Sequence, residues 1–215
     1  ANFEQELNKT IGQLPLNQKE IPTILHPVTP AAEKKYRIAN DPNGVQGAIR
    51  LAQPFPNRHH PDFQPVQVLN TLFGGFFGSR LMSNIREDKG YTYGIHSYIL
   101  NHISTTAWMV STEAGRDVSE ATITEVYNEM KDLREELVDE EELQLVKNYL
   151  IGTILGDLDG PFHIIGRWKN LILNGLDEQY FYKSVNIIKN ISAEELQELA
   201  NKYLHPEKFY ELVVV

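Results

Sequence analysis

The order of strand-like and helix-like segments constrains the fold of this chain more than any other sequence feature. Five segments have the alternating hydrophobicity or the β-branched composition of β-strands: 35–40, 45–55, 93–100, 106–112 and 210–215. The turn signals Asp41-Pro42-Asn43-Gly44 and Asn101-His102 join the first four segments into two hairpins. Hairpins with helices gathered between them predict an α+β fold, in which an antiparallel sheet is covered by several α-helices.

Most of the remaining sequence has helical periodicity. Apolar residues recur at helical spacing in seven segments: 66–73, 80–88, 117–135, 139–157, 161–174, 178–189 and 192–203. Asp62 is the expected N-cap of the first, and Ser192 with Glu195 forms a capping-box signature. Gly74 and Gly75 interrupt the first two helices, which predicts a helix-to-helix corner with close backbone packing.

The N-terminal part of the chain differs from the rest. Apolar residues recur at helical spacing in 2–14, and four prolines follow within 15–33. We therefore expect a linker helix and an extended connector over 1–33. Residues 34–215 are enough for one α+β domain with a sizeable core.

Composition and charge exclude several classes of function. The chain has 20 Lys and Arg against 29 Asp and Glu, a net charge of −9, and no basic stripe, so no nucleic acid is expected as a partner. No apolar stretch is long enough for a membrane span, and no secretory signal pattern is present. The absence of cysteine excludes disulfides and thiolate metal sites and is compatible with either cytoplasm or periplasm.

Motifs for metal binding or nucleophilic attack are not found. None of the seven histidines belongs to His-Glu-x-x-His or His-x-x-Glu-His. The pair His59-His60 lies in a proline-bounded segment without an acidic third ligand at helical spacing, which favours an exposed loop over a metal site. Gly78-Ser79 lacks the Gly-x-Ser-x-Gly frame of a serine nucleophile. No cofactor is therefore expected in this chain.

Two neighbouring motifs resemble a family of zinc peptidases. Leu72-Phe73-Gly74-Gly75 through Ser79-Arg80-Leu81 precedes Ile85-Arg86-Glu87-Asp88-Lys89-Gly90-Tyr91-Thr92-Tyr93-Gly94. This order resembles the pitrilysin/insulinase type (the inverzincins), in which a Leu-Gly-Gly helix end is followed by Ser-Arg-Leu and Leu-Arg-Glu-x-x-Gly-x-x-Tyr. Later segments, within 138–150 and 174–206, are similar to the family's long helix and closing helices. The resemblance covers about residues 35–215.

The resemblance implies that this chain is a C-terminal half-domain that does not bind zinc, similar to bacterial processing peptidases. In the family, an N-terminal half binds zinc through His-x-x-Glu-His and a distant glutamate. The C-terminal half supplies an arginine and a tyrosine seven residues apart, and these positions fall on Arg86 and Tyr93. The family's zinc helix would lie within 58–73, where no such motif occurs. Zinc is therefore expected in a partner half, fused or separate, and a peptide is the expected substrate.

The two residue types suit the implied chemistry. Arg86 can place a guanidinium fork on a substrate carbonyl or carboxylate, and Tyr93 can donate its phenolic proton to an oxyanion. Tyr91 is a competing candidate, but the spacing from Arg86 favours Tyr93. The chain by itself is expected to be inactive.

Two alternatives stay open at this point. The first is a scaffold or interaction subunit that has lost peptidase activity, in which Arg86 and Tyr93 have no role. The second is an autonomous metalloenzyme that uses His59 and His60 with His96 or His102. An upstream His-x-x-Glu-His motif would argue against the first, and metal analysis tests the second.

Overall fold

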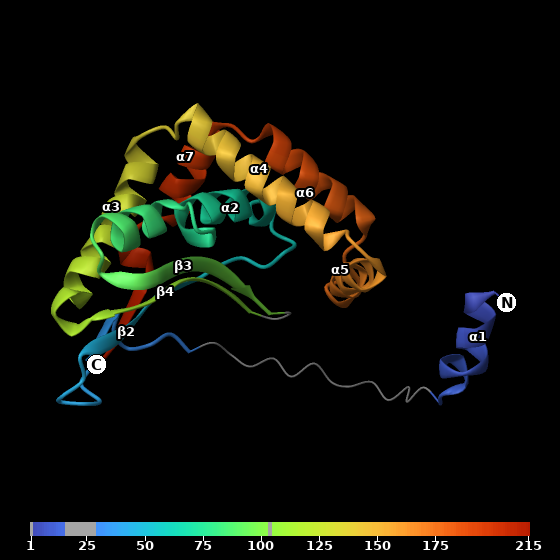
Figure 1. Cartoon of the computed structure of the whole chain (residues 1–215), viewed down its shortest axis with the longest axis horizontal. Helices are drawn as coiled ribbons and strands as arrows, with labels where there is room; N and C mark the ends of the chain where they lie inside the picture. The colour runs from blue at the N-terminus through green and yellow to red at the C-terminus, as the bar shows by residue number, and fades with distance from the viewer. Residues whose placement is uncertain (1, 16–28, 103–104) are drawn as a thin grey trace. The chain divides into compact units, whose positions relative to one another are not determined.

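The structure is a computed structural model that describes residues 2–15, 29–102 and 105–215 (Figure 1). The chain divides into two units, Ala1–Pro30 and Ala31–Val215.

The first unit contains a helix within the segment where one was predicted. Helix α1 (Phe3–Lys9) begins at Asn2, whose side chain accepts a hydrogen bond from the Glu4 backbone N–H at 3.2 Å. A short 3₁₀ turn, Ile11–Gln13, follows, and none of the residues in either helix is buried. Much of the predicted connector, residues 16–28, lies outside the described residues.

The second unit is built on a five-stranded sheet in the order β1-β5-β2-β4-β3. Its strands are β1 (Lys35–Ile38), β2 (Gln46–Pro54), β3 (Thr92–Asn101), β4 (Thr106–Gly115) and β5 (Tyr210–Val214). The five predicted strands are confirmed, and β3 and β4 form the predicted antiparallel hairpin. The α+β class is therefore confirmed.

The pairing at the other edge of the sheet differs from the prediction. β1 and β2 do not form a hairpin, because β5 lies between them and pairs in parallel with β1 (Lys35 with Glu211) and antiparallel with β2 (Ala48 with Val214). The sheet is therefore mixed. The turn that joins β1 to β2 does form, with the Gly44 N–H donating to the Asp41 carbonyl at 3.0 Å. A turn signal fixes the direction of the chain locally, but the strand that pairs is decided by non-local contacts.

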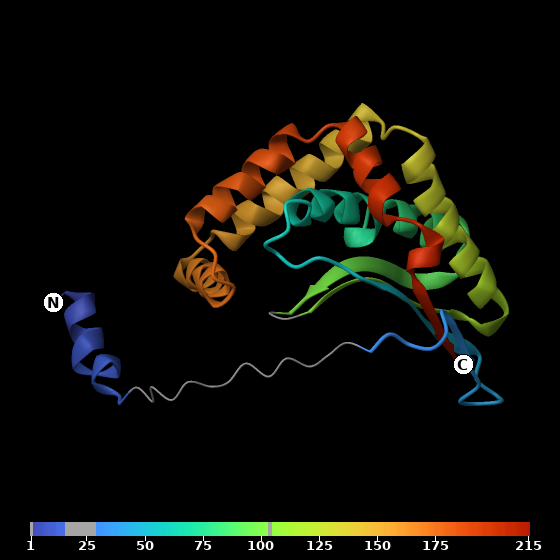
Figure 2. The same cartoon turned by 180° about the vertical axis from the view of Figure 1, so that it is seen from behind.

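Helices cover one face of this sheet. They are α2 (Phe63–Asn70), α3 (Ser119–Glu135), α4 (Glu140–Asp157), α5 (Pro161–Leu173), α6 (Glu178–Asn190) and α7 (Ala193–Tyr203). Figures 1 and 2 show α2, α3 and α7 next to the sheet, with α4 and α6 side by side beyond α2. Two π-helices, η2 (Thr71–Gly75) and η3 (Met82–Asp88), replace regular α-helix in the predicted segments 66–73 and 80–88. The capping box of Ser192 and Glu195 is confirmed.

Aromatic side chains fill the core between the sheet and the helices. The Phe55 ring meets the Trp108 ring edge-on at 5.6 Å and the Tyr203 ring at 5.0 Å, which ties the sheet to α7. Trp108 is fully buried, and its indole N–H donates to the Ser97 hydroxyl at 2.8 Å. Edge-to-face pairs of this kind add to the stabilisation that burial gives.

Asp62 occupies the expected N-cap position of α2, but its side chain does not cap the helix. Asp62 has helical backbone angles, and its side chain makes no capping hydrogen bond to α2. The carboxylate instead pairs with Lys202 and accepts a hydrogen bond from the Tyr203 hydroxyl at 2.7 Å. A charged partner and a phenol give this carboxylate stronger hydrogen bonds than a backbone N–H would, and they also fasten α7 to the start of α2.

Candidate functional site

A tight turn brings the end of η3 onto the first residues of β3. The Lys89 N–H donates to the Asn84 carbonyl and the Tyr91 N–H to the Ile85 carbonyl, each at 3.0 Å. Gly90, between them, has φ of +66°, a left-handed conformation that glycine adopts without steric cost. This turn places Arg86 of the helix opposite Tyr93 of the strand.

Arg86 is held by contacts on several sides. Its Nε donates a hydrogen bond to the Tyr93 backbone carbonyl at 3.0 Å, and its guanidinium carbon lies 4.8 Å from the centre of the Phe77 ring. Its Nη1 is 3.5 Å from the Glu87 carboxylate. The side chain is 34% exposed, so these contacts hold it in position while part of it remains accessible to solvent.

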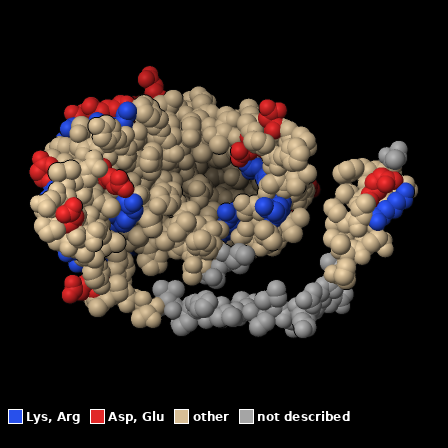
Figure 3. Space-filling model, turned by 60° about the horizontal axis from the view of Figure 1, so that its bottom comes forward, with Lys and Arg blue, Asp and Glu red and all other residues tan. Residues whose placement is uncertain are grey.

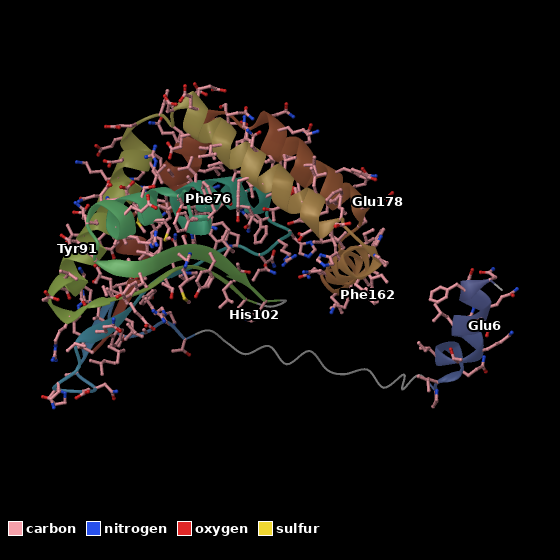
Figure 4. All side chains as sticks on the ribbon, viewed as in Figure 1. Glu6, Phe76, Tyr91, His102, Phe162 and Glu178 are labelled. Atoms are coloured by element: carbon pink, nitrogen blue, oxygen red, sulfur yellow. The ribbon has the colours of Figure 1, made fainter. Side chains whose placement is uncertain are left out.

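The structure distinguishes the two candidate tyrosines clearly. Tyr93 is 93% exposed, whereas Tyr91 is partly buried and packs against the hydrophobic core. A β-bulge between Thr92 and Ile95 shifts the register of β3 against β4 at this point and turns the Tyr93 side chain outward. Figure 4 shows Tyr91 at this end of β3.

The bulge beneath Tyr93 is stabilised by a threonine pair that the sequence analysis did not identify. The Thr92 hydroxyl donates to the Gly94 carbonyl and accepts from the Gly94 N–H, at 3.0 and 3.1 Å. Thr112 of β4 lies 2.8 Å from the Thr92 hydroxyl and is 4% exposed. A local Thr-x-Gly pattern at a strand start is the signal that could have indicated this bulge.

The predicted close packing at the glycine corner is confirmed for Gly74. A Cβ atom at this position would lie 2.7 Å from Cβ and 2.8 Å from the backbone nitrogen of Ser97. The Ser97 hydroxyl donates to the Asn70 side chain at 2.8 Å, and both residues are buried. The corner therefore packs η2 directly against β3.

Arg80 connects the same corner to the long helix α4. Its Nε and Nη2 donate to the two carboxylate oxygens of Glu142, each at 2.8 Å, in a bidentate pair that is largely shielded from solvent. Burial opposes the charge on Arg80, but the bonds to Glu142 outweigh it and raise the pKa of the guanidinium above its ordinary value. Arg80 therefore has a structural role.

Comparison with known proteins identifies the family. The family model of the peptidase M16 inactive domain matches residues 2–150. The chain belongs to the peptidase M16 family. The match to the inactive domain confirms the expected zinc-peptidase family and the expected C-terminal half-domain.

The M16 half-domain spans only part of the length of several similar proteins. An uncharacterized zinc protease of Rickettsia bellii is 26% identical over 149 residues, which are 69% of this chain and 30% of the relative. The crystal structure of a peptidase M16 inactive domain from Pseudomonas fluorescens is 25% identical with a TM-score of 0.79, and the match covers 90% of this chain and 46% of the other. A protease from Helicobacter pylori, 17% identical, shares the fold with a TM-score of 0.83 over 100% of this chain and 53% of its own. The chain thus spans about a third to a half of these proteins.

The described residues of this M16 half-domain do not fit a zinc ion. In the described part of the chain, no group of three or more His, Asp or Glu side chains could hold a metal. The His60 ring accepts a hydrogen bond from the Asp62 N–H at 3.1 Å, and the His59 N–H donates to the Asn57 side chain at 3.1 Å, so these residues form a local turn. None of the described helices has the length and hydropathy that crossing a membrane requires.

Proposed function

We propose that the chain is the non-catalytic half of a two-domain zinc peptidase, in which it completes the substrate-binding chamber. The hydrogen bond from Arg86 Nε to the Tyr93 carbonyl is the observation that carries the proposal. It holds a partly exposed cation beside the backbone of the residue that carries an exposed phenol, at the edge of the sheet, and both residues face outward from this half. Such a pair has no use within the half-domain core, but it can act on a ligand held by a second half.

Tyr93 is proposed to stabilise the oxyanion that develops during peptide hydrolysis. A phenol is a hydrogen-bond donor near neutral pH, and donors aimed at a developing negative charge lower the barrier most when water is excluded. With 93% of the side chain exposed, Tyr93 gains such a setting only when another surface closes over it.

Arg86 is proposed to bind the substrate backbone or a carboxylate beside the scissile bond. Its Nε is occupied by the Tyr93 carbonyl, and the Phe77 ring supports one face of the guanidinium. The remaining Nη nitrogens have a fixed direction, which reduces the entropy lost when a peptide binds.

The proposed partner is a zinc-bearing N-terminal half, either fused or in a separate chain. Zinc in that half would supply the Lewis acid for peptide hydrolysis. The residues of the present chain would bind and orient the peptide.

The test is a cleavage assay with the half-domain joined to the zinc-bearing half of the same protein. We expect Tyr93→Phe to lower kcat by about 100-fold with little change in KM, because the lost bond forms only in the transition state. Arg86→Gln is expected to raise KM by roughly tenfold, because a charge-assisted bond to the bound peptide is lost. Matched controls are Tyr98→Phe, whose hydroxyl contacts Met109, and Lys131→Gln, an exposed cation on α3.

Unchanged activity in both Tyr93→Phe and Arg86→Gln would contradict the proposed roles. If the joined halves cleave no peptide at all while the complex still forms, the chain is a scaffold subunit instead. Thermal unfolding of each variant separates an effect on the site from an effect on folding.

A further inference from the structure

A cavity lies at the other end of β3 from the Arg86–Tyr93 pair. Its volume is about 590 Å³, and its walls come from the segment after β2 and from α2, β3, α4, α5 and α6. We call it the arginine cavity, because Arg58 and Arg167 both line it. Figure 3 shows a hollow beside Lys and Arg side chains, and Figure 4 shows His102 at this end of β3 and Phe162 on α5.

The charge of the arginine cavity is opposite to that of the whole chain. The chain carries a net charge of −9, yet Asp157 is the only carboxylate among the described residues that line the cavity, against two guanidinium groups. Because the two cations converge on one partly enclosed space, their field favours an anion there.

Arg58, which lines this space, has an unsatisfied donor. Its Nε is buried and has no hydrogen-bond partner among the described residues. Burial raises the pKa of the neighbouring Tyr180 phenol, and the positive charge of Arg58 opposes that rise, so the two side chains lie close together. A buried guanidinium N–H without a partner is costly, and a shift of the Arg58 side chain that brings this shielded nitrogen to an acceptor in the cavity would remove that cost.

Arg167 is held in place, and one of its donors is already used. Its Nη2 donates to the Asp157 carboxylate at 2.7 Å, and its guanidinium carbon lies 5.0 Å from the centre of the Phe181 ring. The guanidinium is therefore oriented in advance. The Asp157 carboxylate competes with an incoming anion both for these donors and by charge.

From these contacts we infer that the arginine cavity binds a carboxylate group of a peptide, held between Arg58 and Arg167. The walls also include apolar side chains, among them Ile99, Leu150 and Ile154, which can pack against a residue next to the carboxylate. This inference rests on the proposed peptidase role and adds a substrate class to it.

The cavity and the Arg86–Tyr93 pair define a minimum peptide length. Asn101 lines the cavity and lies eight positions after Tyr93 on the same strand. At about 3.3 Å per residue the two ends of β3 are roughly 26 Å apart, so a peptide that reaches both needs about eight residues. Either of two peptide groups could supply the carboxylate that binds between the two arginines: the C-terminal carboxylate or an acidic side chain.

Binding by the 215-residue chain tests the inference without any cleavage. Four decapeptides that are otherwise free of acidic residues are compared as two pairs. In the first pair the peptide ends in a free carboxylate or in an amide; in the second pair the peptide ends in an amide and carries either one Asp or an Asn at the same position. We expect the acid forms to bind roughly tenfold more tightly than their uncharged counterparts, since two charge-assisted bonds are gained. The Arg58 Nε–Hε signal in ¹H–¹⁵N spectra should shift with the acid forms only. The acid that binds more tightly identifies the source of the carboxylate.

Variants decide whether the two arginines are responsible. Arg58→Gln and Arg167→Gln should remove the preference for the acid forms, whereas the exposed control Lys131→Gln should retain it. Asp157→Asn should increase the preference, because a competing carboxylate is lost; a purely structural role of Arg167 predicts no such gain. Arg58→Lys should retain part of the preference for the acid forms. This result would show that the loss of preference in Arg58→Gln is not caused by misfolding. Equal binding of acid and uncharged peptides, or no shift at Arg58 with millimolar peptide, would overturn the inference.

Cleavage by the joined halves separates this inference from the proposed function. If the joined halves cleave acid and amide peptides with the same KM, the cavity role fails while the peptidase role stands. If they cleave nothing, but the isolated chain still selects acid peptides through Arg58, the peptidase role fails and the cavity role stands.

Discussion

The Nε atom of Arg86 donates a hydrogen bond to the backbone carbonyl of Tyr93 at 3.0 Å. This bond fixes the arginine at the end of η3 to the backbone of the residue on β3 that carries the exposed tyrosine side chain. A lysine at position 86 would retain the charge, but its three donors share one nitrogen, so it lacks the rigid fork that lets arginine hold the carbonyl through Nε and a substrate through Nη.

We therefore predict that Arg86→Lys impairs peptide cleavage by the joined halves nearly as much as Arg86→Gln. The effect should be coupled to Tyr93: in a double-mutant cycle of Arg86→Gln and Tyr93→Phe, the interaction energy should be about 1 kcal/mol or more. Strict additivity of the two changes in kcat/KM would show that the residues act independently.

A second prediction concerns Glu211, a carboxylate on β5 that is 2% exposed. Burial opposes its ionisation, but hydrogen bonds from Arg37, Tyr127 and Lys35 outweigh burial and hold its pKa below the ordinary value. A carboxyl whose pKa is lower in the folded state contributes stability above the unfolded pKa of about 4.3, and that contribution is lost as the pH falls through the folded pKa.

Glu211→Gln should therefore lower the free energy of unfolding at pH 7 by about 2 kcal/mol and flatten its dependence on pH below about 5. Urea unfolding between pH 3 and pH 7 measures both effects. The control Glu135→Gln removes an exposed pair with Lys131 and should change neither by more than about 0.5 kcal/mol. If the free energy of unfolding of Glu211→Gln fell as steeply with decreasing pH as that of the unsubstituted chain, Glu211 would not be the group that causes the pH dependence.

A third prediction compares two glycines. Gly74→Ala should destabilise the fold by about 1–3 kcal/mol, because its Cβ would lie 2.7 Å from the Ser97 Cβ and must force η2 away from β3. Gly152→Ala, in α4 with no atom within 4 Å of the new Cβ, should stabilise it by about 0.5–1 kcal/mol. Thermal unfolding of the two variants measures the opposite signs, and a neutral Gly74→Ala would mean that the corner relaxes freely.

A fourth prediction concerns metal removal. A chelator should leave the melting temperature of the 215-residue chain unchanged, since its described residues contain no metal-binding group. The same chelator should abolish peptide cleavage by the joined halves, and added zinc should restore it. A fall in the melting temperature of the isolated chain would point to a metal site in this half.

The sequence was a good guide where structure is decided locally. The β3–β4 hairpin and the capping box of Ser192 and Glu195 follow from periodicity and spacing, and both are confirmed. The choice of Tyr93 over Tyr91 from its spacing to Arg86 agrees with the exposure of the two side chains, although the role of Tyr93 stays a prediction.

Non-local competition explains what the sequence analysis missed. Asp62 has a capping position but bonds to Lys202 and Tyr203, 140 and 141 residues away. Arg58 and Arg167 meet at one cavity only after several helices have packed, so no local spacing relates them. The insertion of β5 between β1 and β2 has the same origin.

The position of β5 also has a consequence for how the domain is made. β5 follows the other four strands along the chain, yet it lies between β1 and β2 in the sheet. Its residue Glu211 pairs with Lys35 of β1. During synthesis from the N-terminus, β1 and β2 are therefore made long before β5. They cannot pair with β5 until nearly the whole domain has been synthesised. Contacts between residues so far apart in sequence form slowly. Until β5 pairs with them, β1 and β2 each expose an unpaired edge. The sheet of this half-domain is thus completed only after β5 has been synthesised, and until then the nascent chain is exposed to aggregation.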